Sequence, residues 1–203
     1  MTPTDVFSEG SVEADGGRLR YLDGGRGDPL VHLPGAGEAR LTPAHALLAR
    51  HFRVVVFETP APAATLARAA TTLGLDTFNL MGTSRGATAA LALALEAPHR
   101  VRALVLEAPA AIRPDARDPE FERRLAGLAT PTLVLLGTAD AVVPSAMGRV
   151  YKELIPGCHL VFVYAAGHAI GAERPEAFAD VTADFLERRE AFVISRTATV
   201  IHP

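Results

Sequence analysis

The residues most suited to chemistry surround a serine at position 84. Residues 82–86 read Gly-Thr-Ser-Arg-Gly and fit the pattern Gly-x-Ser-x-Gly. A short apolar run, Phe78 to Met81, precedes this pentapeptide, and a segment of high helix propensity, Ala87 to Leu95, follows it. A nucleophile on such a turn needs glycine two residues to either side, because side chains there would collide with the strand and the helix. The pattern therefore predicts an exposed nucleophilic hydroxyl on Ser84 at a helix N-terminus, which favours developing negative charge.

An aspartate and a histidine that could activate Ser84 each follow an apolar run. Asp140 comes soon after the run Pro131 to Leu136, and His168 comes soon after the run His159 to Tyr164. The order Ser, Asp, His along the chain is the one that accompanies this type of turn. We predict that Asp140 accepts the Nδ1 proton of His168, which leaves Nε2 free to take the proton of Ser84.

Several of these residues have alternative interpretations. Asp140 could be a turn aspartate that caps the next helix. Glu107 follows another apolar run and is a reserve acid, although a structural role is preferred for it. Arg85 could offer its charge to an acidic substrate, but an ion pair with a nearby carboxylate is preferred. Most other histidines are interpreted as exposed or helix-end residues: His45, His51, His99, His159 and His202.

The elements that must position these residues alternate between strand and helix. A hairpin is predicted from Ser11 to Leu22, with its turn at residues 15–17. Further strands are expected at 30–33, 53–57, 78–81, 101–106, 131–136 and 159–164, and helices at 43–50, 65–73, 87–95, 118–128, 145–154 and 175–189. This alternation predicts an α/β fold with a largely parallel sheet covered on both faces and an antiparallel pair at its start. Ligands bind beyond the carboxyl ends of such strands, so residues that follow strands are the candidates for a site.

Composition and charge are those of one globular domain. The chain has 203 residues, of which 49% are hydrophobic and 21% charged, with a formal net charge of −3. No basic cluster favours a nucleic-acid or anionic-membrane partner. We expect a cytoplasmic location, because the N-terminus does not resemble a signal peptide, no apolar run could span a bilayer, and the single cysteine, Cys158, cannot form an internal disulfide. No metal-ligand spacing or nucleotide loop stands out, so no metal or cofactor is expected.

Four blocks in a fixed order make the chain resemble the α/β-hydrolase fold superfamily, in its esterase- and lipase-like members. The blocks are residues 29–37, 82–86, 131–144 and 166–178. The resemblance extends over nearly the whole chain, and implies one domain over residues 1–203 with a tail at 191–203. It also implies an eight-stranded, mostly parallel sheet with an antiparallel N-terminal hairpin. Ser84, Asp140 and His168 occupy the family's catalytic positions.

The first block departs from the family. Members usually carry His-Gly there, followed by a residue whose backbone N–H helps to form the oxyanion hole. In this chain Pro34 stands at the histidine position and has no N–H to donate. We therefore assign the two oxyanion donors to the backbone N–H groups of Ala36 and Arg85, and interpret His32 as a histidine within a strand.

A second departure concerns the cap that many members insert between the sixth and seventh strands. Only residues 108–130 are available for it, enough for one short helix, so no substantial lid is expected. The site would then be covered by loops, chiefly residues 58–64 and 112–119. An open site of this kind suits small or terminal acyl groups better than long enclosed chains.

The expected function is hydrolysis of a carboxylic ester or thioester through an acyl-enzyme on Ser84. Amide, C–C and perhydrolytic chemistry use the same residues and stay open. The alternative is a non-catalytic protein that keeps the fold and binds a ligand or a partner. The partly apolar, β-prone tail at 191–203 could add an edge strand, pack on a second copy in a homodimer, or be frayed.

Overall fold

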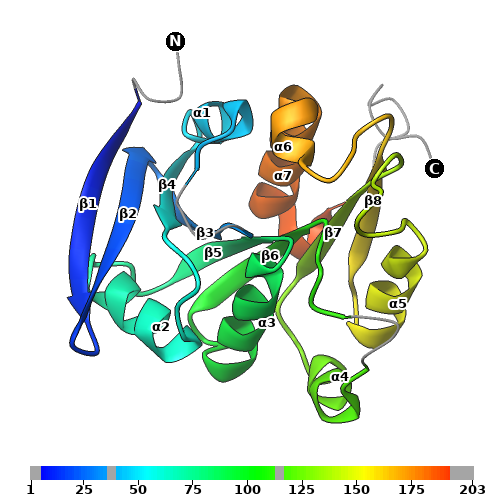
Figure 1. Cartoon of the computed structure of the whole chain (residues 1–203), viewed down its shortest axis with the longest axis horizontal. Coiled ribbons are helices and arrows are strands. Elements are labelled where there is room, and N and C mark those ends of the chain that lie inside the picture. Colours follow the sequence, from blue (N-terminus) through cyan, green and yellow to red (C-terminus); the bar gives the residue numbers. More distant parts are fainter. Residues whose placement is uncertain (1–5, 36–39, 113–116, 193–203) are drawn as a thin grey trace.

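The computed structural model describes residues 6–35, 40–112 and 117–192. Within them, eight strands form one sheet in the order β1-β2-β4-β3-β5-β6-β7-β8 (Figure 1). The strands are β1 Phe7–Ala14, β2 Gly17–Gly25, β3 Asp28–Leu33, β4 Phe52–Phe57, β5 Phe78–Thr83, β6 Val101–Glu107, β7 Thr132–Gly137 and β8 His159–Val163. β2 pairs antiparallel with both β1 and β4, and all other neighbours are parallel. The expected α/β fold with an antiparallel N-terminal hairpin is confirmed.

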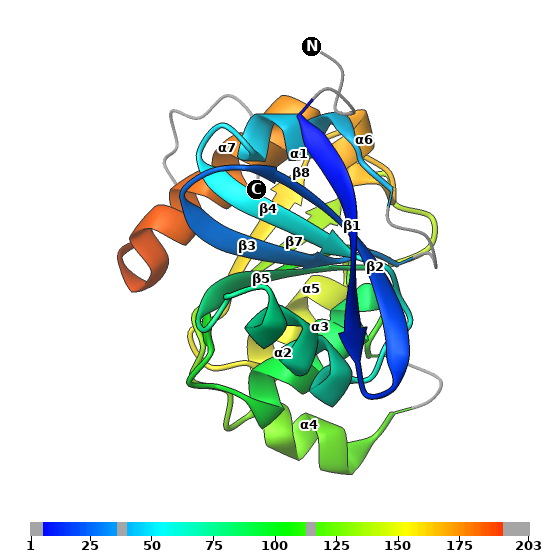
Figure 2. The same ribbon diagram turned by 90° about the vertical axis from the view of Figure 1, so that its left-hand side faces the viewer.

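Helices cover both faces of the sheet (Figure 2). They are α1 Pro43–Leu48, α2 Ala63–Thr72, α3 Gly86–Glu96, α4 Pro119–Leu125, α5 Met147–Leu154, α6 Ile170–Glu173, α7 Pro175–Arg188 and the 3-10 turn η2 Arg189–Ala191. α1, α6 and α7 pack on one face through one apolar cluster, and α2 to α5 pack on the other face through a second cluster. The parallel strands β3 to β7 are therefore largely buried on both sides, whereas β8 at the edge of the sheet is partly exposed.

Strand β4 shows how the sequence produces these two layers. Successive side chains of a strand point to opposite faces. Val54 and Val56 accordingly join the cluster beneath α1 and α7, whereas Val55 and Phe57 join the cluster beneath α2 and α3. All four residues have 0% exposure. β-branched and aromatic residues favour strands, and burial on both faces explains why the run is apolar throughout.

The hairpin turn fits its expected position. Asp15 and Gly16 have φ angles of 52° and 76°, the left-handed pair that a two-residue turn of type I′ requires. β1 and β2 extend beyond the predicted limits, and α6 was not predicted, because four residues are too few to show a helical period. The predicted tail falls outside the described residues from position 193 onward.

Parallel direction brings the candidate residues to one edge of the sheet. β5, β7 and β8 run the same way, so the segments that follow Thr83, Gly137 and Val163 begin at the same carboxyl edge. In the part of the chain that the structure describes, no helix is both long and apolar enough to cross a membrane.

Candidate active site

Ser84 lies on the sharp turn between β5 and α3, with a φ of 52°. This left-handed conformation is uncommon for a residue with a side chain and turns the chain from strand to helix within two residues. The glycines on either side of Ser84 allow the chain to make this turn without steric overlap. A Cβ at Gly82 would lie 2.7 Å from the Cα of Ala87, and a Cβ at Gly86 would overlap the carbonyl oxygen of Leu33. The predicted steric reason for both glycines is present in the structure.

His168 lies between Ser84 and Asp140. Its Nε2 is 2.9 Å from the Oγ of Ser84, and its Nδ1 is 2.9 Å from the Oδ2 of Asp140. The other oxygen of Asp140, Oδ1, accepts hydrogen bonds from the backbone N–H groups of Val142 and Val143, at 2.7 and 2.9 Å. The structure thus brings together the three side chains that the sequence singles out, although they lie far apart along the chain.

The surroundings of Asp140 keep its carboxylate ionised. Its side chain has no exposed surface. Burial acts to raise the pKa of Asp140, but hydrogen bonds from the Val143 N–H, His168 and the Val142 N–H outweigh burial and leave the pKa below its usual value. An ionised Asp140 can only accept from Nδ1–H of His168, so Nε2 is the nitrogen that accepts the Ser84 hydroxyl hydrogen. Asp140 therefore organises its own turn and orients His168 at the same time.

A carboxylate that the sequence analysis missed holds the segment around His168. The two oxygens of Glu173 accept hydrogen bonds from the backbone N–H groups of Gly167 and Ala169, at 2.7 and 3.2 Å. These two residues flank His168, so Glu173 fixes the backbone on both sides of it. A carboxylate five residues after a histidine in a loop is the signal that could have suggested this contact.

Glu107, the reserve acid, is buried at the end of β6 with 6% exposure. Its Oε2 accepts a hydrogen bond from the Thr83 hydroxyl at 2.7 Å, and its Oε1 accepts one from the Gly171 N–H at 2.8 Å. Burial raises the pKa of Glu107, against the opposing effect of these hydrogen bonds. Asp140, rather than Glu107, is the carboxylate hydrogen-bonded to His168. This arrangement agrees with the structural role preferred for Glu107.

His45 lies near the ends of the short helix α1, as one of its two interpretations had it, but the other interpretation, an exposed histidine, is wrong. Its side chain is buried at 3% exposure, and its Nε2 lies 2.8 Å from the Nδ1 of His32, which is also 3% exposed. Burial lowers the pKa of His45 to about 4 and that of His32 well below its usual value. His32 does lie within a strand, as expected, and its Nε2 is 2.9 Å from the Thr83 hydroxyl. The pairing escaped the sequence analysis because each histidine looks isolated in its own segment.

The two predicted oxyanion donors are the backbone N–H groups of Ala36 and Arg85. Ala36 lies outside the described residues. The backbone N–H of Arg85 stands at the N-cap of α3, directly after Ser84. Gly35 also approaches the nucleophile, because a Cβ at this position would lie 2.8 Å from the Cβ of Ser84. The loop after β3 therefore runs against the Ser84 turn.

The preferred ion pair for Arg85 is not found among the residues that the structure describes. Its Nε donates to the carbonyl oxygen of Gly35 at 3.3 Å, and within the described ranges no carboxylate lies in ion-pair contact with its guanidinium. The side chain is exposed. Within the described ranges, the guanidinium beside Ser84 is therefore exposed and has no carboxylate partner.

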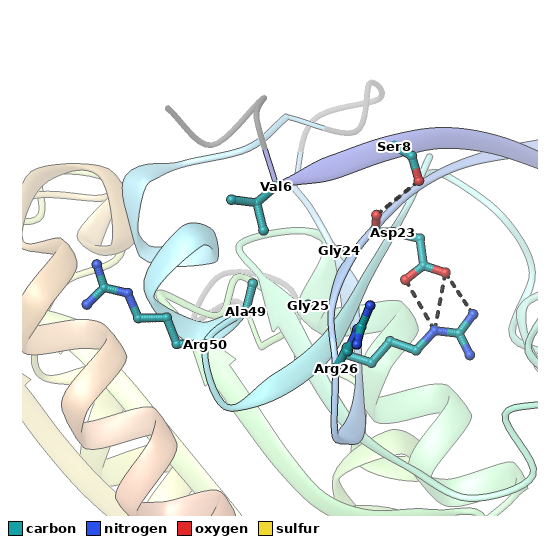
Figure 3. Close-up of a pocket in the computed structure, with 9 residues that line it drawn as sticks. Val6, Ser8, Asp23, Gly24, Gly25, Arg26, Ala49 and Arg50 are labelled. Carbon is teal, nitrogen blue, oxygen red and sulfur yellow. Dashed lines mark hydrogen bonds and ion pairs between the residues drawn. The ribbon is translucent and has the colours of Figure 1, made fainter. Parts of the chain in front are cut away.

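A hollow of about 600 Å³ lies at the opposite edge of the sheet (Figure 3). Its lining includes Gly25 at the end of β2 and Ala49 after α1, and one wall carries an ion pair of 2.7 Å between Asp23 and Arg53. β3 and β4 begin at this edge, whereas Ser84 follows the carboxyl end of β5. The hollow is thus separate from the site of Ser84. Over residues 6–35, 40–112 and 117–192, no group of three or more His, Cys, Asp or Glu side chains could hold a metal ion.

Comparisons with known proteins agree with the fold. A family model described as alpha/beta hydrolase fold matches residues 30–129. "Putative carbamate hydrolase RutD" of Klebsiella pneumoniae is 33% identical over 70 residues, which are 34% of this chain and 26% of that protein. A 2-hydroxy-6-oxo-6-(2'-aminophenyl)hexa-2,4-dienoic acid hydrolase of Metapseudomonas resinovorans is 39% identical over 72 residues, 36% of this chain and 24% of that protein.

The match therefore spans about a quarter of the length of each of these curated relatives. Among solved structures, carboxylesterase CesB of Bacillus subtilis superposes with a TM-score of 0.77 at 19% identity, over 89% of this chain and 91% of the esterase. That likeness concerns the fold. Together with the nucleophile turn and the sheet order, these comparisons show that the chain belongs to the α/β-hydrolase fold superfamily.

Proposed function

We propose that this protein is a serine hydrolase that cleaves a carboxylic ester or thioester through an acyl-enzyme on Ser84. The observation that carries the proposal is the pair of hydrogen bonds, both 2.9 Å, by which His168 joins Ser84 to Asp140. The relatives compared above are all hydrolases, which supports hydrolysis as the class of reaction. A protein that only binds a ligand would not need an ionised aspartate behind a histidine that faces a serine.

Acylation would begin with attack of the Ser84 Oγ on the carbonyl carbon of the substrate. His168 Nε2 takes the hydroxyl proton as the new C–O bond forms, and the carbonyl oxygen becomes an oxyanion. The tetrahedral intermediate then collapses, the bond to the leaving alcohol or thiol breaks, and the His168 imidazolium returns the proton to that leaving group. The acyl group stays on Ser84.

Deacylation would repeat these steps with water. His168 Nε2 takes a proton from the attacking water, the second tetrahedral intermediate collapses to the free acid, and the proton returns to the Ser84 oxygen. Asp140 stays ionised throughout and stabilises the imidazolium that forms in each half of the reaction. The oxyanion would be stabilised by the backbone N–H groups of Arg85 and Ala36, and each such donor typically contributes about 3 kcal/mol.

The proposed substrate is a small acyl compound. α4 is the one helix in the described part of the chain between β6 and β7, where larger members of the fold carry a cap. A site with so little cover leaves the scissile bond partly solvated and offers few contacts to a long chain. A carbamate and a 2-hydroxy-6-oxohexa-2,4-dienoic acid belong in the first substrate panel, because the two curated relatives are hydrolases named for compounds of these kinds.

A covalent probe tests the nucleophile without knowledge of the substrate. The protein would be incubated with a fluorophosphonate, digested and examined by mass spectrometry. We expect one phosphonyl adduct on the peptide that contains Ser84, and none in Ser84→Ala. His168→Gln should react far more slowly although it retains the serine. Labelling of the His168→Gln variant at the wild-type rate would contradict the proposed activation.

A further inference from the structure

A chain of buried hydrogen bonds leads to Glu107 from the far side of β3. The backbone N of Thr42 is 2.9 Å from Nδ1 of His45, and Nε2 of His45 is 2.8 Å from Nδ1 of His32. Nε2 of His32 is 2.9 Å from the Thr83 hydroxyl, which is 2.7 Å from Oε2 of Glu107. The chain thus crosses from α1 through β3 and β5 to β6.

Chemistry fixes the direction of every bond in this chain. A backbone N–H can only donate, so Nδ1 of His45 accepts and its Nε2 carries the hydrogen. His32 therefore accepts at Nδ1 and donates from Nε2 to the hydroxyl of Thr83. That hydroxyl then gives its own hydrogen to Glu107. Both histidines are neutral in this arrangement, as expected where burial lowers the pKa of His45 to about 4.

The other oxygen of Glu107 also accepts. The Gly171 N–H donates to Oε1 at 2.8 Å. An ionised carboxylate accepts at both of its oxygens, as the Thr83 hydroxyl and the Gly171 N–H require. The hydrogen bonds therefore fit an ionised carboxylate, which is buried at 6% exposure and little screened by solvent.

The position of this carboxylate links the two halves of the proposed site. Thr83 immediately precedes Ser84, and the backbone N–H of Ser84 donates to the carbonyl oxygen of Glu107 at 2.9 Å. Gly171 begins α6 with Ile170 and lies three residues after His168. Glu107 therefore holds both the end of the strand that carries Ser84 and the start of the helix that follows His168.

We propose that Glu107 is a positioning residue of the hydrolytic site, an inference that rests on the function proposed above. Its carboxylate fixes the Ser84 turn against the segment of His168. Its buried negative charge stabilises the imidazolium form of His168 through space, in addition to the hydrogen bond that Asp140 accepts from His168 Nδ1–H. Substrate does not touch Glu107.

The effect of the Glu107 charge on His168 must be distinguished from the effects of other charged groups around the site. Asp140 after β7 is hydrogen-bonded to His168, and Glu173 on α6 accepts from the neighbouring backbone. Arg85, after β5, carries the positive charge nearest to Ser84 in sequence. Glu173 and Arg85 are exposed and hence screened by solvent, and Asp140 is unchanged in every variant below. The neutral pair His32 and His45 faces Glu107 from β3 and α1.

The test compares variants that separate charge from shape. Glu107→Gln keeps the size and removes the charge, whereas Glu107→Asp keeps the charge and shortens the side chain. Asp28→Asn is the matched control, since it removes a carboxylate that is exposed at the opposite edge of the sheet. The first measurement is an NMR titration of the His168 ring protons, assigned by their loss in His168→Gln. It does not depend on turnover.

In Glu107→Gln, we expect the titration midpoint of His168 to move to lower pH by about half a unit, because the imidazolium loses a nearby negative charge. The midpoint should stay at its wild-type value in Glu107→Asp and Asp28→Asn. With p-nitrophenyl butyrate, kcat of Glu107→Gln should fall about tenfold while KM changes less than about twofold, as expected for loss of transition-state stabilisation. A folded Glu107→Gln with the wild-type midpoint and kcat, and only a lower Tm, would overturn the proposal.

Thr83→Val serves as a second test if Glu107→Gln does not fold. This substitution removes the hydroxyl that donates to the Glu107 carboxylate but leaves the charge of Glu107 in place. We therefore expect kcat to fall while the titration midpoint of His168 stays at its wild-type value. Wild-type kcat in folded Thr83→Val would contradict the positioning role. The wild-type protein could hydrolyse no ester while the titration midpoint of His168 still moves in Glu107→Gln. That result would support the effect of Glu107 on His168 and contradict the proposed function.

Discussion

The Nδ1 of His168 lies 2.9 Å from the Oδ2 of Asp140, whose side chain has no exposed surface. This contact fixes which nitrogen of His168 faces Ser84. Asp140→Asn would present an amide that can donate to Nδ1 and so favour the wrong tautomer. If Ser84, His168 and Asp140 act as proposed, we expect kcat/KM for p-nitrophenyl acetate to fall by about 10⁴-fold, the loss typical of this substitution in a Ser-His-Asp triad. Asp184→Asn, which alters an exposed ion pair on α7, should retain wild-type kcat/KM, and an equal loss in both variants would refute the assignment.

The buried histidine pair predicts how stability depends on pH. Burial lowers the pKa of His45 from 6.5 to about 4, so the unfolded chain binds a proton there that the folded protein does not. The free energy of unfolding should therefore fall as pH drops from 6.5 toward 4, by about 1.4 kcal/mol per pH unit for one proton. Urea unfolding of the wild type and of His45→Gln checks this slope. A wild-type stability that does not change across this interval would rule out a neutral, buried His45.

The lowered pKa of Asp140 affects the free energy of unfolding at a lower pH than the histidine pair does. Because its folded pKa lies below the usual carboxyl value, Asp140 contributes stability above that usual value, and this contribution is lost as pH falls through the folded pKa. Between pH 5 and 3, the wild type should therefore lose more unfolding free energy than Asp140→Asn. Parallel curves for the two proteins would show that the hydrogen bonds to Asp140 do not stabilise its charge.

The turn at Ser84 predicts that Gly86 cannot carry a side chain. In Gly86→Ala the new methyl group would overlap the Leu33 carbonyl oxygen, so β3 and α3 would have to separate. We expect a loss of about 1 to 3 kcal/mol in unfolding free energy, together with a loss of activity. Gly17→Ala is the matched control, because its Cβ would meet its nearest neighbour, the Ala14 carbonyl oxygen, at 3.7 Å. Equal stability of the two variants would contradict the tight fit.

The exposed charge of Arg85 beside Ser84 predicts a preference between matched substrates. p-Nitrophenyl hemisuccinate and p-nitrophenyl butyrate have four-carbon acyl chains, but only the first bears a terminal carboxylate. Arg85→Gln should lower the ratio of kcat/KM for the anionic ester to that for the neutral one by about fivefold, the most that an exposed charge pair usually contributes. Arg85→Lys should retain most of the ratio, and added salt should reduce it in the wild type. A ratio that is the same in Arg85→Gln would remove Arg85 from substrate selection.

Much of the fold follows from local signals. Runs rich in β-branched residues indicate the strands β4 and β6, and Asp15 and Gly16 indicate the hairpin turn. The glycines around Ser84 indicate the turn between strand and helix. These elements can be predicted because the residues that determine each of them are neighbours in sequence.

Contacts between distant segments were harder to predict. His32 and His45 become partners only because α1 folds back over β3, and neither residue's neighbours in sequence indicate that packing. The bonds of Glu107 to Thr83 and Gly171 likewise depend on the register of β5 with β6 and on α6, which the sequence analysis did not predict. Propensity and periodicity do not report such tertiary neighbours.

The most direct test of the proposed function is time-resolved release of p-nitrophenol from p-nitrophenyl acetate, measured for the wild type and for Ser84→Ala. An acyl-enzyme on Ser84 predicts a rapid burst of about one equivalent of p-nitrophenol per protein, followed by slower turnover, whenever deacylation limits the rate. The burst and the turnover should both disappear in Ser84→Ala. Equal, slow release from the two proteins would contradict the central claim that Ser84 is the nucleophile.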